Sequence, residues 1–335
     1  MVNRATKVGV GALVAYQAYK WVSYVMNPEH SLSKEAVSDR KKRDREVEHK
    51  VTGMSYFLNP DGLFIYWRKW EPIMMQPKGI VIISHGLGEH CSRYEHVAKA
   101  LNEFGLTVYA LDHQGHGQSE GDRVYVYDFE DFPTDVLQLT QIAQKEHPDL
   151  VSTTFLIGHS MGALIAIRTA IKEPNIFKGV VLSAPPLKID EATAPEWQRN
   201  ALSLIAQTFP KLPAPNIPLD TLSTDKRIVD LYVNDPLVNH GLLTARIVNE
   251  IFRTILRTQE EAGTKVTWPY LLMHGTGDKL CMPEGSREFF KMTQNTGSTD
   301  KTFKEYEGSY HELFNEPDHD ENALKDAVEW IRAKL

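Results

Sequence analysis

A serine between two glycines is the residue of this sequence best placed to act as a nucleophile. Ser160 is the centre of the stretch Gly-His-Ser-Met-Gly at 158–162. It follows a short apolar run at 155–157 and precedes an apolar run at 163–167 that continues at helical length. Strand, sharp turn and helix in this order direct a serine hydroxyl outward above a sheet. The flanking glycines permit a tight turn that a Cβ would obstruct. The motif therefore predicts a nucleophilic serine, rather than an exposed serine that only caps a helix.

A serine hydroxyl is a weak nucleophile, so it needs a histidine to accept its proton and a carboxylate to orient the imidazole. Asp278 follows the apolar run at 270–274, and His311 follows the run at 301–306. Both lie just past expected strand ends, on the side of the sheet where Ser160 lies. The chain order of serine, acid and histidine is that of an α/β-hydrolase. Ser160, Asp278 and His311 are therefore the predicted catalytic triad.

The cleavage of an ester also requires two hydrogen-bond donors for the oxyanion of the tetrahedral intermediate. The residue after the nucleophile, Met161, offers one backbone N–H. The loop after the apolar run at 79–84 reads His-Gly-Leu-Gly at 85–88, and it offers the N–H of Leu87. Leu87 and Met161 are therefore the predicted oxyanion hole.

Composition limits the class of protein and its partners. The 335 residues are 42% hydrophobic and 24% charged, which is ordinary for a globular chain with one large domain and an appendage. The net charge of −7 argues against a nucleic-acid partner. The two cysteines, Cys91 and Cys281, cannot build a disulfide framework, so we expect an intracellular, reducing compartment. The sequence contains no zinc-binding motif and no phosphate-binding glycine loop, so we expect no metal and no cofactor.

Strand-like and helix-like runs alternate through most of the chain. Expected strands lie at 54–58, 63–70, 79–84, 106–111, 153–158, 180–184, 270–274 and 301–306. Expected helices lie at 93–104, 129–146, 160–171, 283–292 and 322–335. The first two strands flank Asn-Pro-Asp-Gly and read as an antiparallel hairpin. The other strands alternate with helices, which predicts a mostly parallel central sheet covered by helices on both faces.

The alternation stops at about residues 185–268. This span consists of helical pieces broken by proline, and no buried strand is apparent in it. Ligands of open α/β sheets bind at the carboxyl ends of the strands. We therefore expect the span to form a helical cap over those ends.

The first 30 residues differ from the rest of the chain. Residues 8–26 are mostly apolar and aromatic, and no acidic residue precedes Glu29. The stretch has about the length of a spanning helix, but Gln17 and Lys20 weaken that interpretation. Its tyrosines and tryptophan resemble an interfacial belt. We expect association with an intracellular membrane; a cleaved organellar presequence and an amphipathic helix packed on the protein are the alternatives.

These patterns divide the chain into three parts. Residues 1–30 are the hydrophobic N-terminal segment, and residues 31–50 are a charged linker that is poor in apolar side chains. Residues 51–335 form the α/β-hydrolase domain, with the cap inserted at about 185–268.

Several longer motifs resemble those of the monoglyceride lipases. They are H-G-L-G-E-H-C-S-R-Y (85–94), D-H-Q-G-H-G-Q-S-E-G (112–121), G-H-S-M-G (158–162), Y-V-N-D-P-L (232–237), G-D-K-L-C (277–281) and Y-H-E-L (310–313). The resemblance extends from about residue 54 to the C-terminus. It implies a capped α/β-hydrolase that cleaves monoacylglycerol to fatty acid and glycerol through an acyl-enzyme.

The resemblance also implies residues that bind substrate. Glu89, Arg93 and Tyr232 match positions that organise or contact the glycerol end, and Cys281 matches a cysteine near that pocket. Phe314 stands where the animal lipases have a second histidine. A lysophospholipase, another carboxylesterase or thioesterase, and an acyltransferase with the same acyl-enzyme are the alternatives. The sequence leaves the oligomeric state open.

Deletion of residues 1–50 tests the N-terminal prediction. We expect the deletion to move the protein from the membrane pellet to the supernatant, because it removes the apolar stretch 8–26. Hydrolysis of a soluble ester should survive, because every predicted catalytic residue lies downstream. Cell fractionation followed by an esterase assay measures both. A truncated protein that still pellets would mean either that this segment is not the anchor or that the cap also binds lipid.

Overall fold

The computed structural model of the protein describes residues 55–214, 216–316 and 323–335. The predicted N-terminal segment 1–30 and linker 31–50 lie outside these residues. The chain divides into two compact units, and the unit of residues 54–59 and 64–335 contains the strands and helices given below. A search of the described helices finds none with both the length and the apolarity to cross a membrane.

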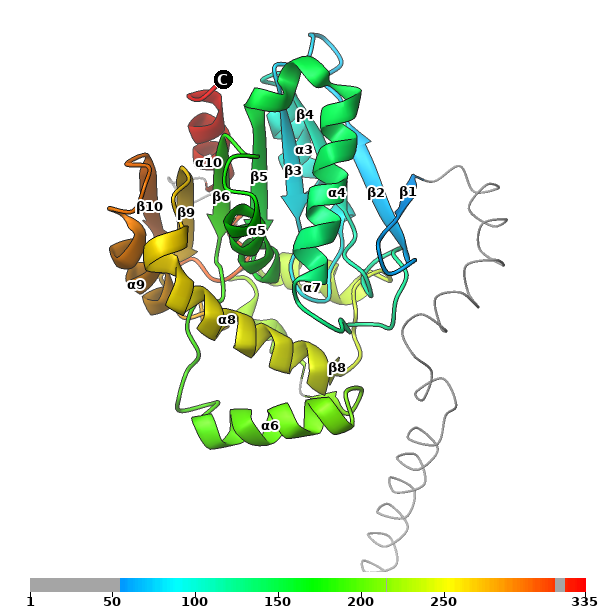
Figure 1. Ribbon diagram of the computed structural model, residues 1–335, viewed down its shortest axis with the longest axis vertical. Helices are drawn as coiled ribbons and strands as arrows, with labels where there is room; N and C mark the ends of the chain where they lie inside the picture. The colour runs from blue at the N-terminus through cyan, green and yellow to red at the C-terminus, as the bar shows by residue number, and fades with distance from the viewer. Residues whose placement is uncertain (1–54, 215, 317–322) are drawn as a thin grey trace, which may run out of the picture. The chain divides into compact units, whose positions relative to one another are not determined.

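In the described part of the chain, eight strands form one sheet in the order β1-β2-β4-β3-β5-β6-β9-β10 (Figure 1). Their bounds are β1 (Tyr56–Leu58), β2 (Phe64–Trp70), β3 (Gly79–Ser84), β4 (Leu106–Leu111), β5 (Thr154–His159), β6 (Gly179–Ser183), β9 (Tyr270–Gly275) and β10 (Lys301–Tyr306). β1 pairs antiparallel with β2, and β2 pairs antiparallel with β4. The remaining neighbours are parallel. The predicted mostly parallel α/β sheet is confirmed.

The central strands are buried along their whole length. Every residue of β3, β4, β5, β6 and β9 is buried. Their continuous apolar, β-branched runs suit this position, because helices cover both faces of such a sheet. The register places Val81 of β3 opposite Val108 of β4 and Phe155 of β5. The aligned strands bring their carboxyl ends, and the loops that follow them, to one edge.

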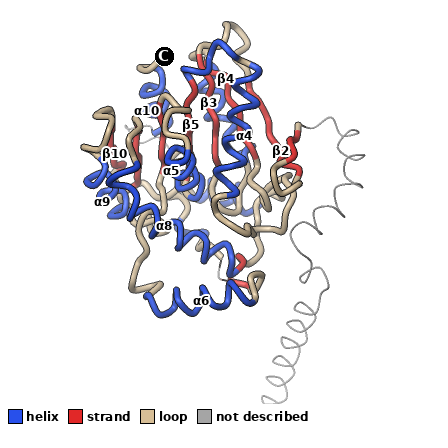
Figure 2. The backbone as a smooth tube through the Cα atoms, viewed as in Figure 1, coloured by secondary structure: helices blue, strands red, loops and turns tan. Residues whose placement is uncertain are grey.

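The helices form two layers, one on each face of the sheet. Their bounds are α3 (Glu95–Asn102), α4 (Asp131–Glu146), α5 (Met161–Lys172), α8 (Ala245–Lys265), α9 (Pro283–Thr293) and α10 (Ala323–Arg332). Val81 of β3 shares a core cluster with Leu101 of α3 and Ile331 of α10. Ile80 and Ile82 point to the opposite face because strand residues alternate, and both are fully buried. α4 and α5 pack against β3 there, in front of the strands in Figure 2.

The segment between β6 and β9 differs in part from the prediction. It contains α6 (Glu196–Thr208), α7 (Lys226–Asn234) and α8, as the helical pieces predicted. It also contains two short strands, β7 (Pro213–Ala214) and β8 (Leu243–Thr244), which pair antiparallel. The apolar pattern did not indicate them, because a strand of two residues shows no alternation. α8 packs against α6 and also against α5 and α9, so it joins the inserted segment to a helix layer.

A substitution at Gly162, in the first turn of α5, tests how closely this helix approaches the end of β3. A Cβ on Gly162 would stand 2.1 Å from Ser84 O and 2.5 Å from His85 O. Both are backbone atoms, so we expect Gly162→Ala to reduce the free energy of unfolding by about 3 kcal/mol.

Gly263 of α8 is the matched control, because the nearest heavy atom to a Cβ there is 4.0 Å away. Gly263→Ala should raise stability by about 0.5–1 kcal/mol through helix propensity and chain entropy. Urea unfolding of both variants measures the contrast. If Gly162→Ala unfolds at the same urea concentration as the wild type, the contact between α5 and the end of β3 is not tight.

Candidate active site

Ser160 lies in a strained turn between β5 and α5. Its φ and ψ are +54° and −124°, a conformation that costs a non-glycine residue about 1–3 kcal/mol. The turn is held on both sides. The Ser160 N–H donates to Ser183 O of β6 at 2.9 Å, and a Cβ on Gly158 would stand 2.3 Å from Gly162 O. The strand–turn–helix geometry that the motif predicts is present, and Ser160 lies at the carboxyl end of the sheet.

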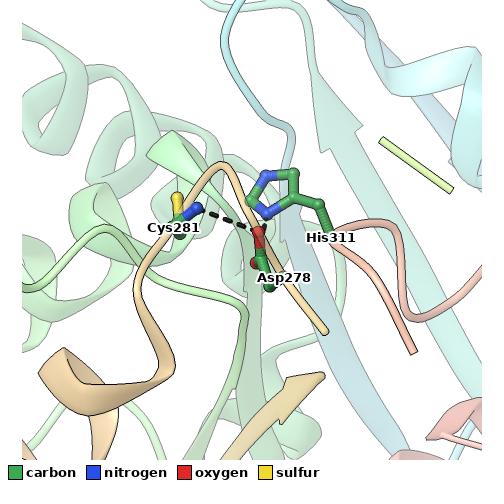
Figure 3. Close-up of side chains that lie close together, drawn as sticks. All are labelled: Asp278, Cys281 and His311. Atoms are coloured by element: carbon green, nitrogen blue, oxygen red, sulfur yellow. Dashed lines mark hydrogen bonds and ion pairs between the residues drawn. The ribbon is translucent and has the colours of Figure 1, made fainter. Parts of the chain in front are cut away.

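The loops after β9 and β10 bring Asp278 and His311 together. The His311 Nδ1 and Asp278 Oδ2 atoms are 2.7 Å apart, and the imidazole points at the carboxylate (Figure 3). Asp278 Oδ1 accepts the backbone N–H groups of Leu280 and Cys281 at 2.8 and 2.9 Å. Burial by itself raises the pKa of Asp278, but the charge of His311 and the hydrogen bonds outweigh it and hold the pKa below its ordinary value.

The pair also changes the basicity of His311. Burial lowers the pKa of His311, but the facing Asp278 carboxylate outweighs burial and raises the pKa above its ordinary value. The carboxylate accepts at Nδ1, which leaves Nε2 as the nitrogen that can take a proton from another group.

His274 is a residue of this site that the sequence did not single out. It is fully buried near the end of β9, and its Nε2 lies 3.2 Å from Asp278 Oδ2 and 3.0 Å from Cys281 O. Its Nδ1 lies 2.7 Å from Ser286 Oγ. His274 therefore helps to fix the Asp278 carboxylate. A histidine inside an otherwise apolar strand is the signal that could have indicated it.

The two predicted oxyanion donors lie on converging elements. Met161 begins α5, where backbone N–H groups lack partners within the helix. Leu87 lies in the turn after β3, and Gly88 takes a positive φ of +80° there. The Gly86 N–H just before Leu87 donates to Glu89 Oε1, which ties the loop down. Leu87 and Met161 as an oxyanion hole stay a prediction.

The three predicted substrate-binding residues lie in one cluster. Arg93 Nη1 donates to Glu89 Oε2, and the guanidinium carbon lies 4.8 Å from the Tyr232 ring centroid. Arg93 also pairs with Glu312, which the sequence prediction did not include. Burial raises the pKa of Glu89, but the charge of Arg93 outweighs this effect and holds it below its ordinary value. Glu89 is therefore an ionised, buried acceptor.

Cys281 lies close to both Ser160 and His311. Its thiol interacts with the side chains of both Ser160 and His311. Asp278, Cys281 and His311 each offer one possible metal-ligand atom, all within 4.8 Å of one another. Both Asp278 oxygens already accept hydrogen bonds, and burial raises the pKa of the Cys281 thiol. Because zinc requires the thiolate, this set fits an acid–histidine pair beside a thiol better than a metal site.

Other histidines near the site order its loops. His85 Nε2 accepts the backbone N–H of His113 at 2.9 Å, and His113 Nε2 lies 2.9 Å from Ser84 Oγ. The ring of His159 lies 4.9 Å from that of His311. Burial lowers the pKa of His159 to about 3 and also lowers that of His85. These imidazoles are neutral at physiological pH.

Comparison with known proteins finds a matching family and similar proteins that are named as lipases. Residues 75–318 match the family described as serine aminopeptidase, S33. The monoglyceride lipase of Mus musculus is 36% identical over 283 residues, which are 84% of this chain and 91% of that protein. The monoacylglycerol lipase of Mycolicibacterium smegmatis is 34% identical over 288 residues, which are 86% of this chain and 98% of that protein.

A solved structure is similar over the same region. The crystal structure of the monoacylglycerol lipase of Paleococcus ferrophilus has a TM-score of 0.72 and 32% identity to this chain. The match covers 81% of this chain and 99% of the other.

Asp278→Asn tests the pairing with His311. A proton acceptor must be neutral, so ester hydrolysis should rise with pH through the pKa of His311. Removing the Asp278 charge lowers that pKa, so the acidic limb of kcat/KM should move to lower pH. We also expect kcat to fall by about 10⁴-fold, because the amide favours the wrong tautomer.

The pH dependence of hydrolysis of a soluble ester measures both effects. Asp300→Asn, at an exposed acid before β10, is the control and should leave the profile unchanged. A wild-type kcat for Asp278→Asn would remove Asp278 as the orienting acid.

Proposed function

This chain belongs to the monoglyceride lipase-like serine hydrolases of the α/β-hydrolase fold, and from this membership we propose that it cleaves monoacylglycerols to fatty acid and glycerol. The chain is a serine ester hydrolase, and the resemblance seen in its motifs is confirmed. The observation that carries the proposal is the buried His311–Asp278 pair, with Nδ1 and Oδ2 2.7 Å apart, beside Ser160 in its strained turn.

In the proposed reaction, Ser160 Oγ attacks the ester carbonyl while His311 Nε2 takes its proton. Asp278 holds the Nδ1–H and stabilises the imidazolium that forms. The N–H groups of Leu87 and Met161 stabilise the oxyanion, and each such donor is typically worth about 10²–10³ in rate. The alcohol leaves with the proton from His311, and water then hydrolyses the acyl-enzyme by the same steps. The proposed reaction uses no cofactor.

The proposed alcohol side of the site is the cluster of Glu89, Arg93 and Tyr232. A buried carboxylate, a guanidinium and a phenol supply acceptors and donors for hydroxyl groups. Glu89 also holds the loop that carries Leu87, so the cluster lies next to a proposed oxyanion donor. This position supports glycerol as the leaving alcohol. Residues 185–268 are the proposed cap, and its α7 contributes Tyr232.

We also propose that the protein works at a membrane surface. The substrate class partitions into lipid, and residues 8–26 have the composition of an interfacial segment. α6 adds support, because Trp197 and Leu204 are 69% and 68% exposed on it. Aromatic and aliphatic side chains in such positions suit contact with the acyl boundary of a bilayer.

Fatty acid release by the wild type and by Ser160→Ala tests the function. We expect rapid release from a long-chain monoacylglycerol and slow release from the matching lysophospholipid, with both lost in the variant. Ser152→Ala, at an exposed serine before β5, is the matched control and should behave as the wild type. Serine-dependent release from the lysophospholipid alone would discard the substrate and keep the mechanism. Equal release by Ser160→Ala would remove Ser160 as the nucleophile.

A further inference from the structure

Two carboxylates and one guanidinium are buried together beside the candidate active site. Arg93 forms a fork on Glu312, with Nη1 to Oε1 at 2.9 Å and Nη2 to Oε2 at 2.8 Å. Its Nη1 also donates to Glu89 Oε2. The side chains of Glu89, Arg93 and Glu312 are only 4%, 10% and 3% exposed. We call these three residues the acidic cluster.

The acidic cluster carries one more negative than positive charge. The imidazoles of His85 and His159 do not balance it, because burial lowers their pKa values and keeps them neutral. His311 faces Asp278, and His90 Nε2 pairs with Asp235 Oδ2 at 2.8 Å. Tyr94 adds only a neutral hydroxyl, which donates to Glu89 Oε1.

The acidic cluster lies close to the proposed nucleophile. A Cβ built on Gly86 would stand 2.9 Å from Glu89 Oε1 and 3.3 Å from Ser160 Cβ. The atoms Glu89 Oε1 and Ser160 Cβ therefore lie no further apart than the sum of these two distances. Glu312 directly follows His311, and its backbone N–H donates to Leu222 O of the inserted segment at 2.9 Å. Asn315 Nδ2 holds Glu312 Oε2 at 3.0 Å, so the carboxylate is fixed in place.

We propose that Glu312 is a specificity-determining residue, which makes the alcohol side of the site favour uncharged or cationic alcohols and disfavour anionic ones. The inference rests on the proposed ester hydrolysis at Ser160. Arg93 alone would attract an anionic head group. Glu89 and Glu312 both pair with this guanidinium. The remaining negative charge of the acidic cluster therefore repels an anionic head group.

The expected size of the effect follows from Coulomb's law. An uncompensated unit charge about 10 Å away, at an effective dielectric constant of about 20, changes the binding of a charged group on the order of tenfold. Solvent and salt screen this interaction little, because the acidic cluster is buried.

The test compares two esters that differ in charge at the alcohol. One is the octanoate ester of glycerol, and the other is the octanoate ester of glycerate, in which a carboxylate replaces one CH₂OH group. The full-length wild type should favour the glycerol ester in kcat/KM. Glu312→Gln should raise the kcat/KM of the glycerate ester, relative to that of the glycerol ester, on the order of tenfold. Glu312→Asp keeps the charge and should restore the wild-type preference.

Glu307→Gln is the matched control for loss of one carboxylate. Glu307 is exposed and lies in the same loop, four residues before His311, so solvent screens its charge. The control should keep the wild-type ratio. A change in Glu312→Gln that is equal for both esters would indicate a structural role and overturn the inference. Failure of the proposed function looks different, because neither ester would then show Ser160-dependent hydrolysis.

A second measurement does not depend on the variant folding. The wild type should be inhibited most by protonated 2-amino-1,3-propanediol, less by glycerol and least by glycerate, with the glycerol ester as substrate. The reverse order, with glycerate as the strongest inhibitor, would show that Arg93 still acts as an anion site and would overturn the proposal.

Discussion

The site depends on the close approach of the first turn of α5 to the end of β3. Gly162 lies so near Ser84 O and His85 O that only a hydrogen atom fits at the position of a side chain. This contact brings the start of α5 against the backbone that leads into the loop of Leu87, and Ser160, two residues before Gly162, has a positive φ. The strain at Ser160 persists because the surrounding strands and helix over-determine the turn. The rigid sheet therefore stabilises the placement of the proposed nucleophile.

Buried charges around this turn occur in sets in which each acid has several hydrogen-bond or ion-pair partners. Asp278 faces His311 and His274 and accepts two backbone N–H groups, so its carboxylate stays ionised without contact with water. Glu89 and Glu312 share Arg93. A buried charge without partners would cost several kcal/mol, which explains why each acid has several donors. The two sets have different proposed roles: the first would orient His311 as the proton acceptor, and the second would form the alcohol side of the site.

The inserted segment contributes directly to this arrangement. Asn239 N–H donates to Gly88 O of the loop after β3, and Glu312 N–H donates to Leu222 O. Tyr232 stacks on Arg93 from α7. The segment therefore contacts both the loop of the proposed oxyanion donor and the loop of His311. A substrate that displaced the segment would also disturb the two loops on which the proposed reaction depends.

The sequence by itself determined the class of fold and the order of the strands and helices. Apolar runs such as 79–84 and 106–111 predicted β3 and β4 residue for residue, because a strand buried on both faces needs apolar side chains throughout. The chain order of Ser160, Asp278 and His311 indicated a shared edge, because parallel strands bring their carboxyl ends together. The strands β7 and β8 were missed, because two residues have no period.

Only the tertiary structure showed the pairing of Arg93 with Glu312 and of His274 with Asp278. Glu312 and Arg93 are 219 residues apart, and nothing in the local sequence of either indicates the other. His274 reads as one polar residue in an apolar strand until β9 places it against Asp278. Local patterns report the preference of a segment for strand, helix or turn, whereas a buried ion pair depends on how distant loops converge. For that reason the sequence predicted Ser160 as the candidate nucleophile, whereas the fold was needed to reveal the full acidic cluster near it.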